Sequence, residues 1–174
     1  MQHIVDDNKD CKLFNLSINS KAPFRKTHMS IWATVIDNLI HEKDVLFVIS
    51  AGNIPFSSIH NYLNNSENYP NYLQEPFCKI ANPAHSSFGI TVGSINHCSF
   101  EDSDWKSLGG ENDVSGFSRI GIGIWGHIKP DVVEYGGGIV SSKNGILNVK
   151  EHAEMATELI RSTLHGGNVV GKDS

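Results

Sequence analysis

An amide side chain follows a short apolar run near the first third of the chain. Residues 45–53 read VLFVISAGN; the first six are almost wholly apolar, and Asn53 ends the stretch. A short run rich in Val, Ile and Phe is typical of a strand buried on both faces in a parallel sheet. Open α/β sheets place their ligands at the carboxyl ends of such strands. Asn53 therefore either forms the turn after the strand or donates hydrogen bonds from its side-chain amide to a ligand.

Other patterns that could do chemistry are incomplete. Residues 121–126, GIGIWG, match GxGxxG, but Pro130 stands where the helix of a dinucleotide-binding loop should run. The acid that should follow roughly 20 residues on is missing too, which favours a plain glycine-rich loop. None of the nine histidines lies in HExxH or pairs with cysteine at ligand spacing, so we expect no metal. His85 and His127 are candidate catalytic groups, with a surface histidine as the default, and no serine lies in GxSxG.

Composition excludes several classes of function. The 174 residues suffice for one domain with a sizeable core. A net charge of −5 and scattered lysines and arginines predict no nucleic-acid partner. No apolar stretch approaches about 18 residues, so we expect no membrane partner, and the N-terminus has no signal-peptide pattern. The three cysteines lack CxxC spacing, which argues against zinc and a disulfide framework and favours a reducing, cytoplasmic compartment. We expect no cofactor.

A strand–helix–strand unit must position Asn53. Residues 11–18 read as a first strand, and residues 29–43 carry an apolar stripe at helical spacing. Ser30 can cap this helix, and Lys43 lies near its C-terminus, where a cation is favourable. With the strand at 45–50, the pattern predicts a βαβ unit whose two strands are parallel neighbours.

The rest of the chain gives weaker signals. Residues 54–80 read as a long, exposed surface loop with short helical turns, and residues 96–113 as a second exposed loop. Residues 88–95 predict a third strand, and a further short strand is expected at 131–133. Helical spacing of apolar residues predicts a helix near 150–164.

Four stretches, taken in order, resemble the subtilisin-like serine protease family (subtilases, peptidase S8). LFNLSINS resembles the strand and turn that line the substrate cleft, and VLFVISAGN resembles the strand with the AAGN signature. NPAHSSFGITVGSI and GFSRIGIGIWGHIKPDVVEYGG resemble the YPA…VIAVGA and FSSRGP…IKPDVVAPG segments. The resemblance covers most of the chain. It implies a three-layer α/β/α fold with a mainly parallel central sheet, here incomplete.

The resemblance also implies roles for particular residues. Asn53 would be the catalytic oxyanion-hole residue, whose amide donates to the negative oxygen of the tetrahedral intermediate. Two short segments would form the walls of the pocket for the residue before the scissile bond and bind substrate backbone as an added strand. These wall residues are Ser17, Ile18 and Asn19 on one side and Ser50, Ala51 and Gly52 on the other.

The sequence departs from the family in two ways. Asn19 and Ser20 stand where two glycines are usual, which implies a narrower pocket or an altered strand. The family's aspartate motif, H-G-T-H helix and G-T-S-x-A-x-P serine motif are all absent. We therefore interpret residues 1–174 as an internal part of a subtilase catalytic domain, with the rest of the parent chain as a partner. The ending STLHGGNVVGKDS resembles the segment before the serine motif, which would make 158–164 a strand.

Three functions remain open at this level. The first is the core of a serine endopeptidase that hydrolyses peptide or protein substrates. The second is a catalytically inactive subtilase-like domain that binds peptides or regulates another protein. The third is an unrelated flavodoxin-like α/β module with a small ligand at its strand ends, although the chain has no phosphate-cradling loop. Nucleophilic catalysis needs a serine, a base and an orienting carboxylate together, and this chain supplies at most the oxyanion donor.

Overall fold

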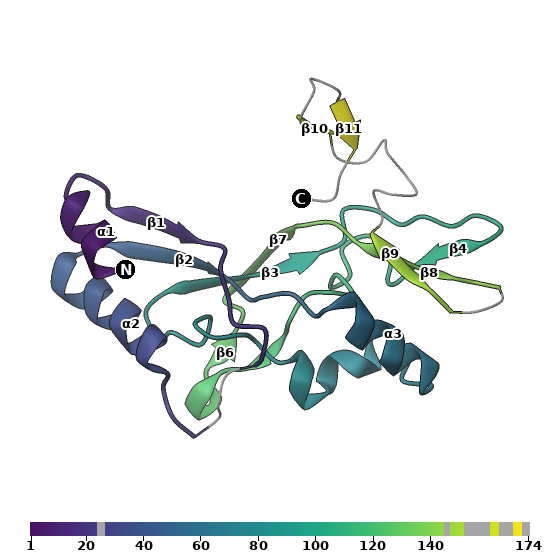
Figure 1. Cartoon of the computed structure of the whole chain (residues 1–174), viewed down its shortest axis with the longest axis horizontal. Coiled ribbons are helices and arrows are strands. Elements are labelled where there is room, and N and C mark those ends of the chain that lie inside the picture. The colour runs from purple at the N-terminus through teal and green to yellow at the C-terminus, as the bar shows by residue number, and fades with distance from the viewer. Residues whose placement is uncertain (24–26, 145–146, 152–160, 164–168, 172–174) are drawn as a thin grey trace. The chain divides into compact units, whose positions relative to one another are not determined.

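The structure is a computed structural model (Figure 1) that describes residues 1–23, 27–144, 147–151, 161–163 and 169–171. The chain divides into two compact units. The first unit comprises Met1–Asn53, Gln74–Gly93 and Arg119–Val133, and the second Ile54–Leu73, Ser94–Ser118 and Glu134–Ser174. Within the described ranges, no helix has both the length and the apolar character needed to cross a membrane.

The predicted βαβ unit is present in the first unit (Figure 1). Strand β1 (Leu13–Leu16) leads through helix α2 (Ile31–Lys43) to strand β2 (Leu46–Ser50). Ser30 caps α2 as expected, since its side chain accepts a hydrogen bond from the Ala33 amide at 3.1 Å. The helix ends at Asp44, a non-glycine residue in the left-handed region with φ 51°.

The main sheet has the strand order β1-β2-β3-β7, where β3 is Ile90–Ile95 and β7 is Val132–Tyr135. Strands β1 and β2 are parallel neighbours, with Leu16 opposite Ile49, and β2 and β3 are parallel as well. The prediction that the first two strands are parallel is thus confirmed, and so is the α/β fold with a mainly parallel sheet. The strand predicted at 131–133 is present slightly later, as β7.

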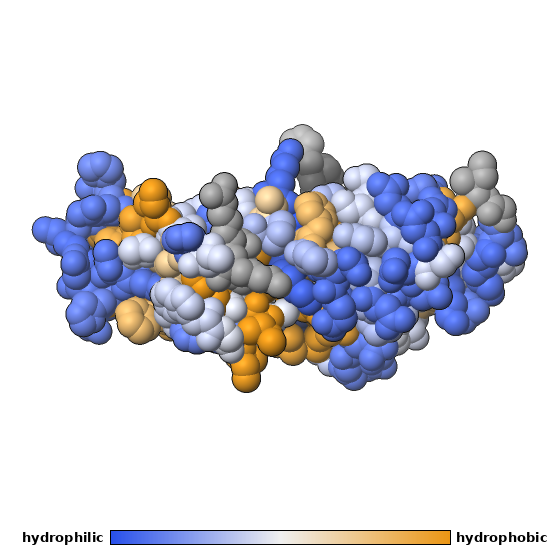
Figure 2. Space-filling model, turned by 90° about the horizontal axis from the view of Figure 1, so that it is seen from below, coloured by the Kyte–Doolittle hydropathy of each residue, from blue (hydrophilic) through white to orange (hydrophobic). Residues whose placement is uncertain are grey.

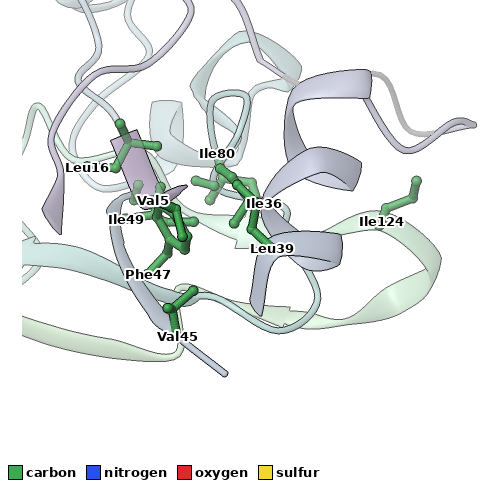
Figure 3. Packing of buried hydrophobic residues seen from close by; sticks show 11 residues of the cluster. Val5, Leu16, Ile36, Leu39, Val45, Phe47, Ile49, Ile80 and Ile124 are labelled. Carbon is green, nitrogen blue, oxygen red and sulfur yellow. The ribbon is translucent and has the colours of Figure 1, made fainter. Parts of the chain in front are cut away.

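The core of the first unit lies between β2 and two helices. Phe47 and Ile49 of β2 are fully buried and cluster with Ile36 and Leu39 of α2 (Figure 3). Helix α1 (Gln2–Asp7) adds Val5 to the cluster. The other face of β2 is only half-buried, so the prediction of a strand buried on both faces is wrong: the residues alternate between buried and half-buried. Alternation of this kind anchors β2 through one face.

The glycine-rich segment forms a hairpin and not a cofactor loop. Strand β5 (Gly121–Ile122) pairs antiparallel with β6 (Ile128–Lys129), and a short 3₁₀ helix, Ile124–Gly126, joins them. A dinucleotide fingerprint would open a longer helix at this point, so the GxGxxG match has no such meaning here. Three apolar side chains of the hairpin are exposed, namely Ile122, Trp125 and Ile128. Figure 2 shows apolar patches of this kind on a mainly hydrophilic face.

The stretch 54–80 contains the short helical turns that were predicted, but it also contains an α-helix and fully buried side chains, so the prediction of a long exposed loop is wrong. Helix α3 (Phe56–Asn64) and the 3₁₀ helix Asn71–Gln74 belong to the second unit, and the 3₁₀ helix Pro76–Cys78 to the first. Ile59, Tyr72 and Leu73 are fully buried. These buried residues are isolated apolar side chains in a segment rich in Asn and Ser. The polar composition of the segment therefore gave no sign in the sequence that they are buried.

The second exposed loop, predicted at 96–113, also contains structure. Strand β4 (Trp105–Ser107) lies in it and pairs with β8 (Ile139–Ser142), which in turn pairs with β9 (Val149–Glu151). Leu108 and Asn96 are buried, and the Asn96 side chain donates to the Leu108 carbonyl at 3.1 Å. The segment is therefore only partly a loop.

Near the C-terminus, strand β10 (Arg161–Thr163) pairs antiparallel with β11 (Val169–Gly171). This agrees with the strand that the family resemblance implies at 158–164 and contradicts a helix at those three residues of β10. Residues 150 and 151 of the predicted helix belong to β9, which contradicts a helix there too, and residues 152–160 and 164 lie outside the described residues.

Candidate active site

The two predicted walls follow the ends of adjacent parallel strands. Ser17 follows β1 directly and is exposed, and Ile18 next to it is 67% exposed although it is a large apolar residue. Strand β1 is an edge of the described sheet. Within the described residues, the backbone of Ile18 and Asn19 makes no hydrogen bond to other backbone groups. An extended peptide could therefore pair with this segment as an added strand.

The second wall ends in a sharp turn that presents Asn53. Gly52 is buried with φ +94°, a conformation that a residue with a Cβ adopts only with strain. Asn53 follows it and is exposed. No hydrogen bond of its side-chain amide to another described residue is present, so its two N–H donors face solvent. The positive φ explains why a glycine precedes Asn53. Gly52 makes the turn, and the side-chain amide of Asn53 is left without a bond to another described residue.

A buried arginine holds the backbone of this turn. Arg119 is fully buried, its backbone amide donates to the Gly52 carbonyl at 3.0 Å, and its Nε donates to the Asn53 carbonyl at 3.1 Å. The rest of its guanidinium donates to the carbonyls of Lys79 at 3.0 Å, Lys21 at 2.8 Å and Phe77. Its charged carbon also lies 5.0 Å from the centre of the Phe77 ring. Arg119 thus joins segments far apart in sequence at the turn before the candidate donor.

Ala81, which we call the floor, lies against Ala51 and Gly52 of the second wall. Its amide donates to the Ala51 carbonyl at 2.9 Å, and the Ala51 amide donates to the Val92 carbonyl at 2.8 Å. The Ser20 amide donates to the Asn82 carbonyl at 2.8 Å, so the residue after the first wall is bonded to the residue after the floor. Both backbone polar groups of Ala51 are consequently used within the protein.

The two walls are joined directly by side chains. The Asn19 amide nitrogen donates to the Ser50 carbonyl at 2.8 Å, and the Ser50 hydroxyl donates to the Asn19 amide oxygen at 2.5 Å. Of the six predicted wall residues, the structure brings Asn19 and Ser50 into contact with each other. Ala51 and Gly52 lie buried behind them, and Ser17 and Ile18 are exposed beside them.

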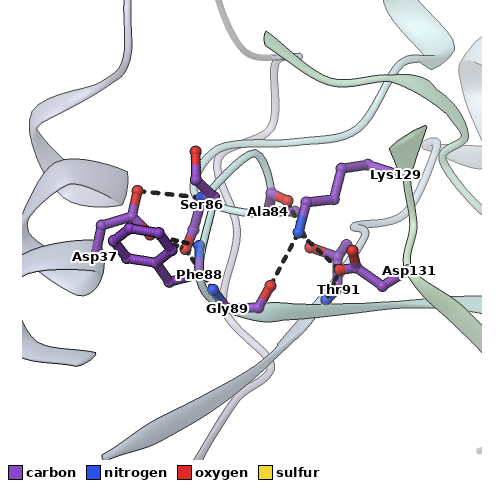
Figure 4. A network of polar contacts seen from close by, with 9 residues as sticks. Asp37, Ala84, Ser86, Phe88, Gly89, Thr91, Lys129 and Asp131 are labelled. Carbon is purple, nitrogen blue, oxygen red and sulfur yellow. Dashed lines mark hydrogen bonds and ion pairs between the residues drawn. The ribbon is translucent and has the colours of Figure 1, made fainter. Parts of the chain in front are cut away.

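A polar network fixes the loop that carries the floor (Figure 4). Asp37 of α2 accepts hydrogen bonds from the Ser86 hydroxyl at 2.5 Å and the Phe88 amide at 3.0 Å. Lys129 is buried, forms an ion pair with Asp131 at 2.7 Å and donates to the Gly89 carbonyl at 2.9 Å. Residues 86–89, which lead directly into β3, are thereby held by Asp37 of α2 on one side and Lys129 of β6 on the other.

His85 is buried, so its interpretation as a surface histidine is wrong; His127 is exposed as expected. The ring Nε2 of His85 accepts a hydrogen bond from the Ser30 amide at 3.2 Å, which requires that nitrogen to be unprotonated. The pKa of His85 is lowered to about 4, mainly by burial; the charge of Asp37 opposes this shift, and the charge of Lys129 adds to it. His85 is neutral at pH 7 and supports the cap of α2.

We expect the free energy of unfolding to fall as the pH drops from about 6.5 to about 4. In this range His85 binds a proton in the unfolded chain but stays neutral in the folded chain. Above pH 6.5 both states are neutral at this ring and the effect vanishes. The shift from 6.5 to about 4 corresponds to at most about 3 kcal/mol. Chemical unfolding at pH 7 and pH 5 measures it. His85→Gln, which can still accept from Ser30, should show a smaller difference between the two pH values; an unchanged difference would assign the effect to other groups.

No group of three or more His, Cys, Asp or Glu side chains is arranged to hold a metal ion within the described part of the chain. The three cysteines are free thiols, and only Cys78 is buried.

Comparison with known proteins decides the family. A model of the subtilase family matches residues 1–170, nearly the whole chain. The chain belongs to the subtilase family. An uncharacterized protein of Sinorhizobium fredii (strain NBRC 101917 / NGR234), y4bN, is 32% identical over 137 residues, which are 75% of this chain and 32% of that relative. The chain thus spans about a third of the length of this curated relative.

Membership in the subtilase family relates the chain to serine proteases, which are hydrolases. Asn53 and the six wall residues were predicted from the ordered motifs, and their roles stay predictions. Arg119 and Ala81, which the structure places in contact with the turn at 51–53, were not predicted. The one local sign of Arg119 was its place in the FSR segment, within the stretch that resembles FSSRGP.

Proposed function

We propose that, in the whole protein, this subtilase chain supplies the oxyanion donor and the substrate walls of a serine endopeptidase. The exposed, unpaired amide of Asn53 carries the proposal. It stands at the carboxyl end of β2, on a turn whose backbone Arg119 holds from the buried side. A donor fixed before the reaction begins stabilises developing charge without reorganisation, which is the requirement for an oxyanion hole.

In this role, each part of the site does one task. Ile18 and Asn19 bind the substrate backbone as an added strand and so place the scissile carbonyl. Asn53 then donates an N–H to the carbonyl oxygen as it becomes negative in the tetrahedral intermediate. The attacking serine and its base are not among the motifs of this sequence, so the nucleophilic step belongs to other parts of the whole protein.

Peptide binding without hydrolysis is the second candidate function. The open backbone of Ile18 and Asn19 would serve it equally well, and it needs no nucleophile. Hydrolysis by the whole protein separates the two. Turnover of a fluorogenic peptide or of casein, stopped by a serine-directed reagent, supports the peptidase. Peptide binding with no turnover would assign the binding function instead.

We expect residues 1–174 by themselves to hydrolyse no peptide or ester substrate, because no residue in them fills the role of activated nucleophile. The measurement is release of product from an activated acyl substrate by the purified chain, compared with buffer. Reproducible turnover that a serine-directed reagent abolishes would show that a nucleophile and base are present after all.

A further inference from the structure

We propose that Asn19 determines substrate specificity by closing the pocket between the two walls, so that only glycine or alanine fits before the scissile bond. The inference rests on the proposed function for its substrate. Its structural basis is independent: the side chain of Asn19 in one wall is hydrogen-bonded to Ser50 in the other wall.

The Asn19–Ser50 pair is reciprocal, and this fixes the Asn19 side chain across the gap. Its nitrogen donates to the Ser50 carbonyl at 2.8 Å, and its oxygen accepts from the Ser50 hydroxyl at 2.5 Å. Both ends of the amide are thus satisfied by one residue. An amide held through both of its polar atoms has a single orientation, unlike a solvated surface side chain.

The space beneath the pair is filled as well. A methyl group in place of the Gly52 hydrogen would lie 2.7 Å from Ala81 Cβ, 3.1 Å from Arg119 Cδ and 3.5 Å from Asn19 Cγ. Ala81 and Arg119 cannot withdraw easily, because the Ala81 amide is bonded to Ala51 and the guanidinium donates to four backbone carbonyls. A large substrate side chain therefore cannot go around Asn19 and must displace it.

Displacement is unfavourable because it breaks two hydrogen bonds. Each broken bond lowers affinity by up to roughly tenfold, and more where the freed groups stay out of water. Burial of a leucine or phenylalanine side chain would recover part of this, but only after the walls had separated. Glycine and alanine need no displacement, so they keep the full affinity of the backbone pairing.

The test compares the whole native protein with Asn19→Gly. Substrates are a set of peptides that differ only in the residue before the cut. We expect the native protein to prefer alanine over phenylalanine by roughly a hundredfold in kcat/KM, and Asn19→Gly to reduce that preference by at least about tenfold. Equal acceptance of phenylalanine by the native protein, with hydrolysis intact, would overturn the inference and leave the proposed function standing.

A second measurement does not depend on hydrolysis. Saturation-transfer NMR with p-cresol, a small analogue of a tyrosine side chain, reports an open pocket directly. Asn19→Gly should bind p-cresol and the native protein should not; binding to both, or to neither, contradicts the inference. If p-cresol behaves as expected but neither protein hydrolyses any peptide, the peptidase proposal fails and the closed pocket remains.

Two further variants separate pocket closure from folding. Asn19→Asp keeps the volume and the acceptor for Ser50 but loses the donor to the Ser50 carbonyl, so it should open the pocket less than Asn19→Gly does. Ser50→Ala removes one of the two hydrogen bonds but leaves Asn19 bonded to the Ser50 carbonyl, so it should open the pocket less than Asn19→Gly does. Thermal unfolding of all variants shows which remain folded. Equal opening by all three would mean that the wall is simply loosened.

Discussion

Replacement of Asn53 by leucine in the whole protein should lower kcat by roughly 10²–10³-fold, which corresponds to a rise of about 2.7–4 kcal/mol in the activation free energy. This magnitude is carried over from an asparagine of subtilisin, which belongs to the same family. Leucine keeps the volume of the side chain and removes its donors. Because the donor acts only when the carbonyl oxygen becomes negative, kcat and kcat/KM should fall together while KM changes little. Steady-state kinetics of peptide hydrolysis measure the effect.

The controls for this variant follow from the structure. Asn53 is exposed and its side chain is bonded to no other described residue, so the melting temperature should stay near the native value. Asn61→Leu, the same change at an exposed residue of α3, should leave kcat unaltered. A large fall in melting temperature with unchanged kcat would mean that Asn53 only terminates the turn after β2.

Arg119→Met should give the largest loss of stability among the site variants, about 3–5 kcal/mol. The guanidinium is fully buried, and its removal leaves the carbonyls of Asn53, Lys79, Lys21 and Phe77 without this donor. Since small domains are stable by only about 5–15 kcal/mol, a substantial part of this variant should be unfolded near physiological temperature. Urea unfolding at pH 7 measures the difference.

Two further variants test whether the charge of Arg119 or its set of donors accounts for the loss of stability. Arg119→Lys keeps the charge but has a single nitrogen that cannot reach four carbonyls, so it should restore little of the stability. Lys9→Met removes an exposed positive charge and should change stability by less than about 0.5 kcal/mol. If Arg119→Lys were as stable as the native protein, the charge and not the fork of donors would be what matters.

The predictions for Asn53 and Arg119 concern the same turn after β2. Asn53 supplies the donor, and Arg119 fixes the backbone on which that donor stands. A donor that moves by a fraction of an ångström loses much of its effect on a transition state. Where Arg119→Lys still folds, kcat should therefore fall more than KM rises, and this pattern distinguishes positioning of Asn53 from general loosening of the fold.

The sequence by itself determined the central architecture. The helical stripe at 29–43 and the apolar run at 45–50 have periods that depend on local geometry, so they predicted α2, β2 and the parallel pairing with β1. The order of four short motifs indicated the subtilase family and pointed to Asn53.

Only the tertiary structure decided how the site is closed and held. Asn19 meets Ser50 across 31 positions, Arg119 meets Lys21 across 98, and His85 meets Ser30 across 55. No local period records such contacts, because the two partners lie far apart in sequence and meet only when the sheet brings their segments together. For the same reason the segment at 54–80 looked like solvent-exposed loop: its buried residues Ile59, Tyr72 and Leu73 are isolated in a polar sequence, and their burial depends on neighbours supplied by the fold.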